Sequence, residues 1–453
     1  MTNLVVSGDA KMENQNYAEA VHNAYAQCVE ALERNKAQFL DHPEKDFSRE
    51  RKITFLSCVR FCVEAGGGAL QNELLKFFSF DQMTPTKSAF CQQRGKISSE
   101  AFACLFHAFT DRLERMESAK TSKGYRVLAS DGSALNLPYN PSDKETFHEN
   151  GEKKGYNQIH LNALYDISNG YYADCALAPE GKVHERVALQ EMLARLPDTM
   201  KAILLMDRGF EGYDVLASLL LSGQKFVQRL KDVNSNGILS SWNLPDDREF
   251  DMEIQTVLTT RHTREIIEDR ETYTVLSSRT VFHFPDENHP FFPMKLRILR
   301  MEIAPGVFEC VATNLSADEF SLEEIKELYH MRWGEETSFR DLKYTLDLLH
   351  FHAKKRQYVE QEIYAGLVRF NFCGAIANHA NPPAPRKNKE RKYDYKICFL
   401  AAASICLEYM KRAPDSMNPC LLITRFLTAI RPERSFPRNI KSQSAKSFLY
   451  RPA

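Results

Sequence analysis

The sequence predicts an α/β protein in which a mixed sheet, interrupted by a β-rich insertion, lies between helical N- and C-terminal regions. Two observations support this prediction. Residues 125–230 alternate short apolar runs with helical segments in the order β-β-β-α-β-α-β, which is the pattern of an α/β domain. Within that order, residues 202–206 (Ala-Ile-Leu-Leu-Met) are apolar throughout, as expected for a central strand that is buried on both faces.

Length and composition are those of an ordinary globular protein. The chain has 453 residues, of which 43% are hydrophobic and 26% charged, and this length indicates more than one domain. No N-terminal run is long enough for a signal peptide, and the longest apolar run, residues 397–407, is too short to span a membrane. Eleven cysteines without CxxC spacing indicate reduced thiols. We therefore expect a cytoplasmic protein with no membrane segment.

Charge is distributed unevenly along the chain. Residues 351–453 contain 19 Lys and Arg and 7 Asp and Glu, a net charge of +12, whereas the first 350 residues contain 40 basic and 53 acidic groups, a net charge of −13. A basic segment of this size is typical of proteins that bind a polyanion. Its most concentrated part is residues 386–392, which follow the proline-rich turn at 382–385 and are expected to form a loop.

The N-terminal region, residues 1–118, is predicted to be helical. Two short helices, 69–78 and 86–94, lie on either side of a turn that contains Pro85, and a third follows at 98–115. Two short helices across a turn form the helix-turn-helix of many DNA-binding proteins, but helical bundles share the pattern. The sequence leaves both interpretations open. In the helix-turn-helix interpretation, the side chains that face DNA are Lys87, Gln92, Gln93 and Arg94.

Strands and helices of the central region were assigned from periodicity and turn signals. We expect strands at 125–130, 159–167, 171–177, 202–206 and 225–230, helices at 185–196 and 213–221, insertion strands at 253–259, 272–277 and 294–303, and a strand at 308–313 that returns to the main domain. The predicted parts are a helical region (1–118), the first part of the main domain (119–230), the β-rich insertion (231–306), the second part of the main domain (307–350) and a basic helical region (351–453).

The helix that follows the insertion carries a polar stripe. At about 100° per residue, its members fall within an arc roughly 60° wide, whereas Glu335 projects to about 240°, outside that arc. A phenol, a guanidinium, a carboxylate and an ammonium on one stripe suit phosphate binding, with the carboxylate placed to hold a metal ion. A solvated helix with i,i+4 ion pairs gives a similar pattern. The choice between a binding stripe and a solvated helix therefore depends on the rest of the chain. The members of the stripe are Tyr329, Arg332, Glu336 and Lys343.

Three acids have positions that suit a metal site. Asp131 follows the first predicted strand, Asp207 follows the buried strand 202–206, and Glu336 lies on the helix after the insertion. Acids at strand ends and on a covering helix can converge, and Mg²⁺ is usually held by a few carboxylates together with water and substrate phosphate. Two such ions can bind the attacking and leaving oxygens of a phosphodiester. Any one of these acids alone is weak support, because Asp at a strand end is often a turn or helix cap.

These residues resemble the DDE transposases of bacterial insertion sequences, in the cut-and-paste group marked by a Tyr-Arg-Glu-Lys signature. The segments Asp131-Gly-Ser and Asp207-Arg-Gly match the first two acidic blocks of that family, and the resemblance covers roughly residues 50–450. The signature is Tyr, two residues, Arg, three residues, Glu, six residues and Lys. The chain matches it without a gap at Tyr329, Arg332, Glu336 and Lys343.

The resemblance implies a ribonuclease H-like catalytic domain with a β-rich insertion between the second Asp and the Glu. It also implies two divalent ions, Mg²⁺ or Mn²⁺, in each active site, and no organic cofactor. The metal ligands it implies are Asp131, Asp207 and Glu336. The side chains it implies for binding phosphates near the cleaved DNA end are Tyr329, Arg332 and Lys343.

The resemblance further implies an activity and partners. Members of the family bind the terminal inverted repeats of their element, cleave phosphodiester bonds and join the freed 3′ ends to target DNA, generally as a dimer on two paired ends; some pass through a hairpin. Related enzymes hold a flipped base on a tryptophan of the insertion. Trp242 lies in that region, where a surface or core role is the more common one. Trp333 is expected to pack its helix onto the sheet.

Two other functions stay open from the sequence. One is a DNA-binding protein of transposase descent that no longer cleaves, which has no need of three correctly placed metal carboxylates. The other is a two-metal nuclease without strand transfer. The basic C-terminal region and the cationic stripe favour a protein that holds a defined DNA end instead.

Overall fold

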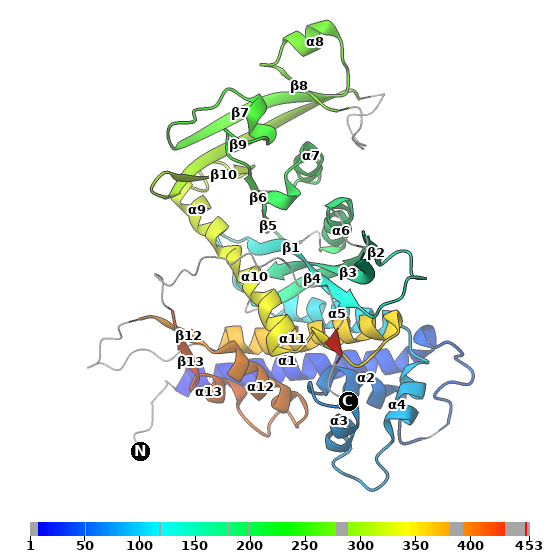
Figure 1. The fold of residues 1–453 in the computed structure, drawn as a ribbon. Helices are drawn as coiled ribbons and strands as arrows, with labels where there is room; N and C mark the ends of the chain where they lie inside the picture. The colour runs from blue at the N-terminus through cyan, green and yellow to red at the C-terminus, as the bar shows by residue number, and fades with distance from the viewer. Residues whose placement is uncertain are drawn as a thin grey trace.

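A ten-stranded mixed sheet runs through the centre of the computed structural model (Figure 1). The structure describes residues 8–49, 51–116, 119–151, 153–179, 182–197, 199–277, 289–380, 393–430 and 449–450. The strand order is β2-β3-β1-β5-β6-β10-β9-β7-β8, and β4 also pairs with β3. The strands are β1 (Arg126–Leu137), β2 (Phe147–Asn150), β3 (Lys153–Asp166), β4 (Tyr171–Ala178), β5 (Ala202–Met206), β6 (Lys225–Leu230), β7 (Phe250–Thr259), β8 (Tyr273–Val275), β9 (Phe291–Ala304) and β10 (Val307–Thr313).

The first five long strands along the chain confirm the predicted fold class. Strands β4, β3 and β1 pair antiparallel, whereas β1, β5 and β6 pair parallel. The order β4-β3-β1-β5-β6 is that of a ribonuclease H-like sheet, in which a three-stranded antiparallel meander continues into parallel strands joined by helices. Strand β5 is buried along its whole length, as its continuous apolar sequence predicts.

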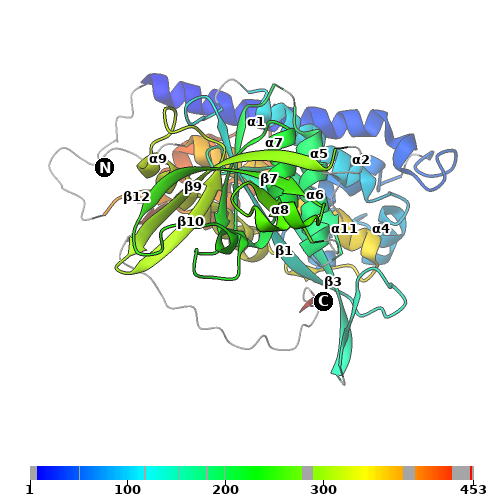
Figure 2. The same ribbon diagram turned by 90° about the horizontal axis from the view of Figure 1, so that it is seen from above.

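Strand β1 is longer than the sequence indicates. The expected strand ended at residue 130, but pairing with β3 continues to Leu137, so that Asp131 lies inside the strand opposite Ala163 and not after it. The sequence pattern ends the strand at Asp131-Gly-Ser because Asp and Gly are typical turn residues. Beyond Ser130, β1 no longer pairs with β5. Strand β3 extends further and forms with β2 a hairpin that projects from the body (Figure 2).

The β-rich insertion continues the main sheet. Strand β10 pairs with β6 on one side and with β9 on the other, and β9 then pairs with β7. Side chains on one face of these strands join those of β5 and β6 in a single apolar cluster, which includes Leu204, Phe226 and Ile298. The insertion therefore shares its core with the main domain, while its tip, with β8 and the short helix α8 (Arg264–Glu268), lies farthest from the helical layer (Figure 1).

Helices from both ends of the chain form one layer beneath the sheet (Figure 1). Its helices are α1 (Gly8–Arg34), α2 (Phe55–Glu64), α3 (Leu70–Phe77), α4 (Lys87–Arg94), α5 (Glu100–Glu114), α11 (Arg356–His379), α12 (Phe399–Met410) and α13 (Pro419–Ile423). The other helices are α6 (Lys182–Arg195), α7 (Tyr213–Leu221), α9 (Leu322–Met331), α10 (Trp333–Arg340), the 3₁₀ turns η1 (Lys36–Phe39), η2 (Arg208–Phe210) and η3 (Ile238–Ser241), and the π-helical turn η4 (Asp341–Thr345).

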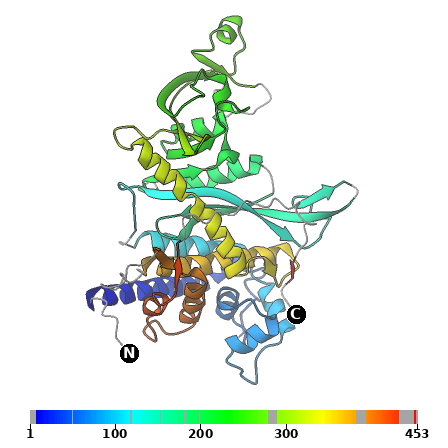
Figure 3. The same cartoon turned by 60° about the vertical axis from the view of Figure 1, so that its left-hand side comes forward.

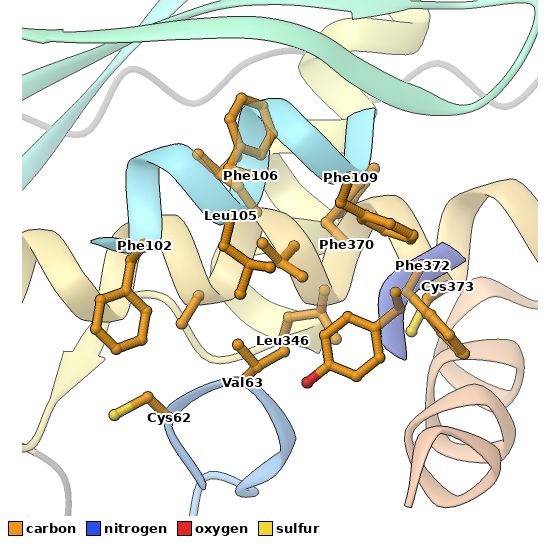
Figure 4. Packing of buried hydrophobic residues seen from close by; sticks show 14 of the residues in the cluster. Cys62, Val63, Phe102, Leu105, Phe106, Phe109, Leu346, Phe370, Phe372 and Cys373 are labelled. Atoms are coloured by element: carbon orange, nitrogen blue, oxygen red, sulfur yellow. The ribbon is translucent and has the colours of Figure 1, made fainter. Parts of the chain in front are cut away.

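Aromatic side chains fill the space between α5 and α11 (Figure 4). Phe109 of α5 and Phe372 of α11 stack with ring centroids 6.4 Å apart, and Tyr25 of α1 approaches both rings edge-on at 6.0 Å. Aromatic pairs of this kind add to the stability gained from burying their area. Because α11 is buried along most of its length, it is the central helix of the layer and joins the N-terminal helices to the sheet.

Two small pairs of strands complete the described chain. Strand β11 (His350–Phe351) pairs parallel with β14 (Leu449–Tyr450), and β12 (Tyr395–Ile397) pairs antiparallel with β13 (Leu427–Ala429). The predicted basic loop at 382–392 lies outside the described residues. None of the described helices combines the length and the apolar character that crossing a membrane requires.

Arg94 is buried, contrary to the prediction that it faces DNA. Its guanidinium is 5% exposed and donates to Gln361 Oε1 at 2.6 Å, to Glu362 Oε1 at 2.9 Å and to the Tyr358 carbonyl at 2.6 Å. These partners all lie on α11, more than 260 residues away in sequence, so no local pattern could reveal them. Arg94 therefore fixes α4 to α11, whereas Lys87 and Gln92 are exposed.

We predict that Arg94→Ala lowers the free energy of unfolding by about 3–5 kcal/mol, because it leaves the buried Glu362 carboxylate without its ionic partner. Urea denaturation followed by circular dichroism measures the loss. The matched control is Arg264→Ala, which breaks the exposed i,i+4 pair with Glu268 and is expected to cost about 0.5 kcal/mol or less. Equal losses in the two variants would show that the Arg94 network does not stabilise the fold.

Candidate active site

The three acids that the sequence predicts for a metal site lie on three different elements of the fold. Asp131 lies in β1, and its Oδ1 accepts a hydrogen bond from the Gly132 amide at 2.7 Å. Asp207 follows β5 and caps the turn η2, where its Oδ1 accepts from the Gly209 amide at 2.6 Å. Because β1 and β5 are adjacent parallel strands, these two acids lie at the same edge of the sheet. The third acid, Glu336, is on α10, which packs against β1.

The helix with the polar stripe is not one regular helix. Its first part, α9, begins at the predicted capping box, in which Ser321 and Glu324 exchange hydrogen bonds between side chain and backbone. The second part, α10, runs obliquely from the insertion toward α11 (Figures 1 and 3). At the junction the Arg332 amide donates to the Tyr329 carbonyl and the Glu335 amide to the Arg332 carbonyl, which are i→i−3 bonds. After α10, the chain forms the π-helical turn η4.

Glu335, which the sequence places outside the polar stripe, is buried at this junction. It is 0% exposed, and the Asp131 amide favours its charged form. Helical spacing alone does not mark Glu335 as a buried residue.

Arg332 is the cation at the centre of the site. Its guanidinium is 4% exposed and donates from Nη2 to Glu336 Oε1 at 3.0 Å. The guanidinium carbon lies 5.8 Å from the ring centroid of Tyr329 and 5.2 Å from that of Trp333, within the range of cation–π attraction. Contrary to expectation, Trp333 does not pack onto the sheet, because 47% of its surface is exposed. Its ring covers Arg332 from the solvent side.

The acids of the site influence one another electrostatically. The pKa of Asp131 is raised to about 6, mainly by burial. The negative charges of Asp207 and Glu336 contribute to this rise, and the Gly132 amide and Arg332 oppose it. Burial also raises the pKa of Glu335 well above its usual range, with a further contribution from Asp131. A neighbouring negative charge raises the pKa of an acid only when the two groups are near each other. Asp131, Asp207, Glu336 and Glu335 are therefore near enough to influence one another electrostatically.

The two remaining side chains of the stripe differ in exposure. Lys343, in η4, donates from Nζ to the Ala134 carbonyl of β1 at 3.2 Å, and burial lowers its pKa while the charge of Asp131 opposes this shift. Tyr329 is buried in the apolar cluster beneath α9, and burial raises its pKa. Phosphate contacts by Tyr329 and Arg332 stay predictions from the sequence, since both side chains are covered in the structure.

The donor set suits a hard divalent cation. Mg²⁺ and Mn²⁺ prefer carboxylate oxygens, and a cation would relieve the repulsion that raises the pKa of Asp131. Within the described part of the chain, however, no three His, Cys, Asp or Glu side chains stand close enough together to hold a metal ion as they are placed. The ion pair with Arg332 holds Glu336. Metal binding at Asp131, Asp207 and Glu336 therefore requires side-chain movement.

Trp242 lies apart from these acids. It follows η3, packs against the apolar cluster of the main sheet and the insertion, and lies 6.3 Å from the ring of Tyr213 on α7. Its indole N–H is buried without a partner among the described residues. These contacts are those of a core residue, and they give no support to the role in base stacking that its position in the insertion suggested.

The fold and the acidic site define a protein of the ribonuclease H-like class with carboxylates at the ends of its central strands. The chain belongs to the Transposase DDE domain family, whose pattern matches residues 122–371. That family consists of enzymes that cleave DNA and transfer its strands. Strands β1 to β10, and the helices α9 and α10, all lie within the matched segment.

Two individual proteins are similar to this chain. The transposase for insertion sequence element IS231F of Bacillus thuringiensis subsp. israelensis is 21% identical over 303 residues, which are 60% of this chain and 60% of that protein. The chain thus matches about 60% of the length of this relative. The piggyBac transposase in a synaptic complex with hairpin DNA, solved by cryo-EM, superposes with a TM-score of 0.40 at 10% identity, over 92% of this chain and 75% of that one.

We predict that Asp131→Asn raises the thermal unfolding temperature of the metal-free protein above pH 6, because it removes a buried negative charge. The pKa of Asp131 is about 6 in the folded protein and about 3.9 in an unfolded chain. The folded state therefore binds the proton more tightly, and wild-type stability falls as the pH rises from about 4 to about 6. The difference between variant and wild type should grow over this window and then stay constant. Thermal scans from pH 4 to pH 8 in EDTA measure it.

The control is Asp318→Asn, at an exposed site outside the cluster. Its unfolding temperature should follow the wild-type value at every pH. If the difference in unfolding temperature between Asp131→Asn and wild type does not change with pH, Asp131 is not in the buried, acidic environment described above.

Proposed function

We propose that this protein is a transposase that binds the terminal inverted repeats of an insertion sequence, cleaves phosphodiester bonds with two divalent metal ions and joins the freed 3′ ends to target DNA. Its partners are duplex DNA at the element ends and at the target, and a second copy of the chain on the paired end. It acts in the bacterial cytoplasm, where the nucleoid DNA lies. The observation that supports this proposal is the match of the DDE family to the segment that contains Asp131, Asp207 and Glu336. The first two follow the paired ends of adjacent parallel strands, and the third is on the helix that packs against β1.

The carboxylates have separate structural supports, which suits them to binding metal. The Gly132 and Gly209 amides hold Asp131 and Asp207 in place, while the Arg332 guanidinium holds Glu336. Bound Mg²⁺ or Mn²⁺ would lower the pKa of an attacking water or 3′-hydroxyl and neutralise charge on the leaving oxygen. We assign metal binding to Asp131, Asp207 and Glu336, and we assign Arg332 the positioning of Glu336 before metal and DNA arrive.

Lys343 is the side chain of the stripe best placed to contact DNA. It lies on the π-helical turn after α10, partly exposed, with its ammonium over the β1 strand that carries Asp131. An ammonium beside the acids would attract the phosphate of the bond to be cleaved. The basic C-terminal region, with its net charge of +12, provides a second, less specific attraction for DNA.

We predict that the wild-type protein with Mg²⁺ nicks and joins duplexes made from the sequences that border its gene. Glu336→Gln should lower the rate of both steps by on the order of 10³-fold, because metal-assisted charge stabilisation contributes several kcal/mol. Gel analysis of end-labelled duplexes measures both steps. The matched comparison is Glu335→Gln. Because burial raises the pKa of Glu335 well above its usual range, the amide resembles the neutral acid, and this variant should keep most of its activity.

The outcomes of this experiment distinguish the proposal from its alternatives. Nicking without joining would indicate a two-metal nuclease, and binding without nicking would indicate a protein that has lost cleavage. Loss of activity in Glu335→Gln combined with activity in Glu336→Gln would transfer the metal-binding role to Glu335.

We further predict that Lys343→Ala weakens binding to the end duplex and lowers the slope of log K against log salt by about one unit, as expected when one phosphate contact is lost. Fluorescence anisotropy from 50 to 300 mM NaCl measures this slope. Lys343→Arg, which keeps the charge, should retain the wild-type slope. An unchanged slope in Lys343→Ala would remove this side chain from the DNA contacts.

A further inference from the structure

Helix α6 packs against both neighbours of the two aspartates of the site, strand β3 and the turn η2. Asp131 lies in β1 opposite β3, and Asp207 caps η2. Glu185 of α6 reaches a side chain of β3, and Arg186 reaches the backbone that follows η2. Two adjacent residues of one helix thus contact the surroundings of both aspartates.

The two faces of β1 pack against different helices. Ala129 belongs to the apolar cluster that contains Tyr329 of α9, whereas Leu128 belongs to the cluster that contains side chains of α6. Side chains of a strand alternate between its faces. Asp131 therefore lies on the face of β1 that α9 covers, and Gly132 lies on the face that α6 covers.

The imidazole of His160, on β3, lies directly on Gly132. A Cβ atom at position 132 would overlap His160 Cε1 and stand 2.7 Å from its Nδ1, so only glycine leaves room for the ring. Both ring nitrogens are held, because Nδ1 lies 3.0 Å from Asn162 Oδ1 and Nε2 lies 3.5 Å from Glu185 Oε1. The ring therefore fixes the backbone of β1 at the residue whose amide binds Asp131.

Stability alone does not account for this polar cluster. His160 and Asn162 are 7% and 3% exposed, and the Asn162 Nδ2 is buried without a hydrogen-bond partner among the described residues. A buried donor that lacks a partner costs folding free energy, and apolar side chains at these positions would avoid that cost. The cluster is thus better explained by what it does at Gly132.

Arg186 holds the segment that follows Asp207. Its Nη1 donates to both carboxylate oxygens of Asp214, at 3.0 and 2.8 Å, and its Nη2 donates to the Glu211 carbonyl at 3.0 Å. A guanidinium bound at several points fixes direction as well as distance. The backbone after η2 is therefore held to α6, and through Asp214 also to the adjacent helix α7 (Figures 1 and 2).

We propose that α6 positions the two aspartates for metal binding, with Glu185 acting through His160 on Asp131 and Arg186 acting through the turn η2 on Asp207. The proposal rests on the metal-binding function proposed above, and it makes these residues of α6 and β3 positioning residues that touch neither metal nor DNA. Two metal ions about 3.5–4 Å apart tolerate little change in the spacing of their ligands. One helix that holds both aspartates keeps this spacing constant when the third acid moves.

Amide hydrogen exchange of the full-length, metal-free protein, measured by mass spectrometry, tests the proposal. Glu185→Ala should speed exchange in residues 130–136 by about tenfold and leave residues 206–212 unchanged, because it loosens only the contact with β1. Arg186→Ala should have the reverse effect. The matched control is Glu191→Ala, at an exposed position of the same helix, which should change neither segment.

Binding of Mn²⁺, followed by electron paramagnetic resonance of the free ion, is the second readout. Glu185→Ala and Arg186→Ala should each bind Mn²⁺ about tenfold more weakly than wild type, as is usual when a residue that supports a metal ligand is lost. Glu191→Ala should bind like wild type. A purely structural role of Glu185 and Arg186 would lower the thermal unfolding temperature of the variants and leave the Mn²⁺ affinity of the folded protein unchanged.

Three results would each overturn the proposal: unchanged exchange in both variants, a uniform rise in exchange over the whole chain, or altered exchange with unchanged Mn²⁺ affinity. Failure of the proposed function gives a different result, because wild type then binds no Mn²⁺, or neither nicks nor joins DNA. The exchange pattern needs no metal, so in that case it still decides whether α6 holds the two aspartates.

Discussion

The structure depends on one crowded contact, the packing of α10 against β1. It places Asp131, Glu335 and Glu336 near the guanidinium of Arg332, a residue that is 4% exposed. A buried cation of this kind is costly unless it is paired, and here the carboxylate of Glu336 and the rings of Tyr329 and Trp333 surround it. The protein thus tolerates an excess of acid because Arg332 offsets part of it, and the remainder is the charge that a divalent metal ion can neutralise.

The order of the strands explains how residues distant in sequence meet at this contact. Asp131 and Asp207 are brought together by the parallel pairing of β1 with β5. Glu336 follows about 130 residues later because the chain first builds β7, β8 and β9, which extend the same sheet, and returns through β10 beside β6. The helix that starts after β10 must cross the sheet to reach α11, and its route passes over β1. Both ends of the insertion are thus anchored in the sheet that carries Asp131 and Asp207.

Much of this arrangement could be predicted from the sequence wherever local patterns determine where a strand or helix begins and ends. Strands β5 and β6 and helix α7 have the predicted bounds, since apolar runs and helical spacing are unambiguous there. The burial of Glu335 could not be predicted from helical spacing, because it depends on how α10 packs against β1. Arg94 looked like a surface residue of a DNA-binding helix, yet its partner Glu362 is 268 positions away. In each such case a tertiary contact overrode a correct local pattern.

Burial gives two arginines of this protein different roles. Arg94 donates to Gln361, to Glu362 and to the Tyr358 carbonyl, and so fixes α4 to α11. Arg332 donates to Glu336, while its Nε is buried without a partner among the described residues. A buried guanidinium is costly unless its hydrogen bonds are made, so Arg94 stabilises the helical layer more than Arg332 stabilises the site. The position of Glu336 therefore depends on a guanidinium that is only partly satisfied, and a bound cation would compete with Arg332 for this carboxylate.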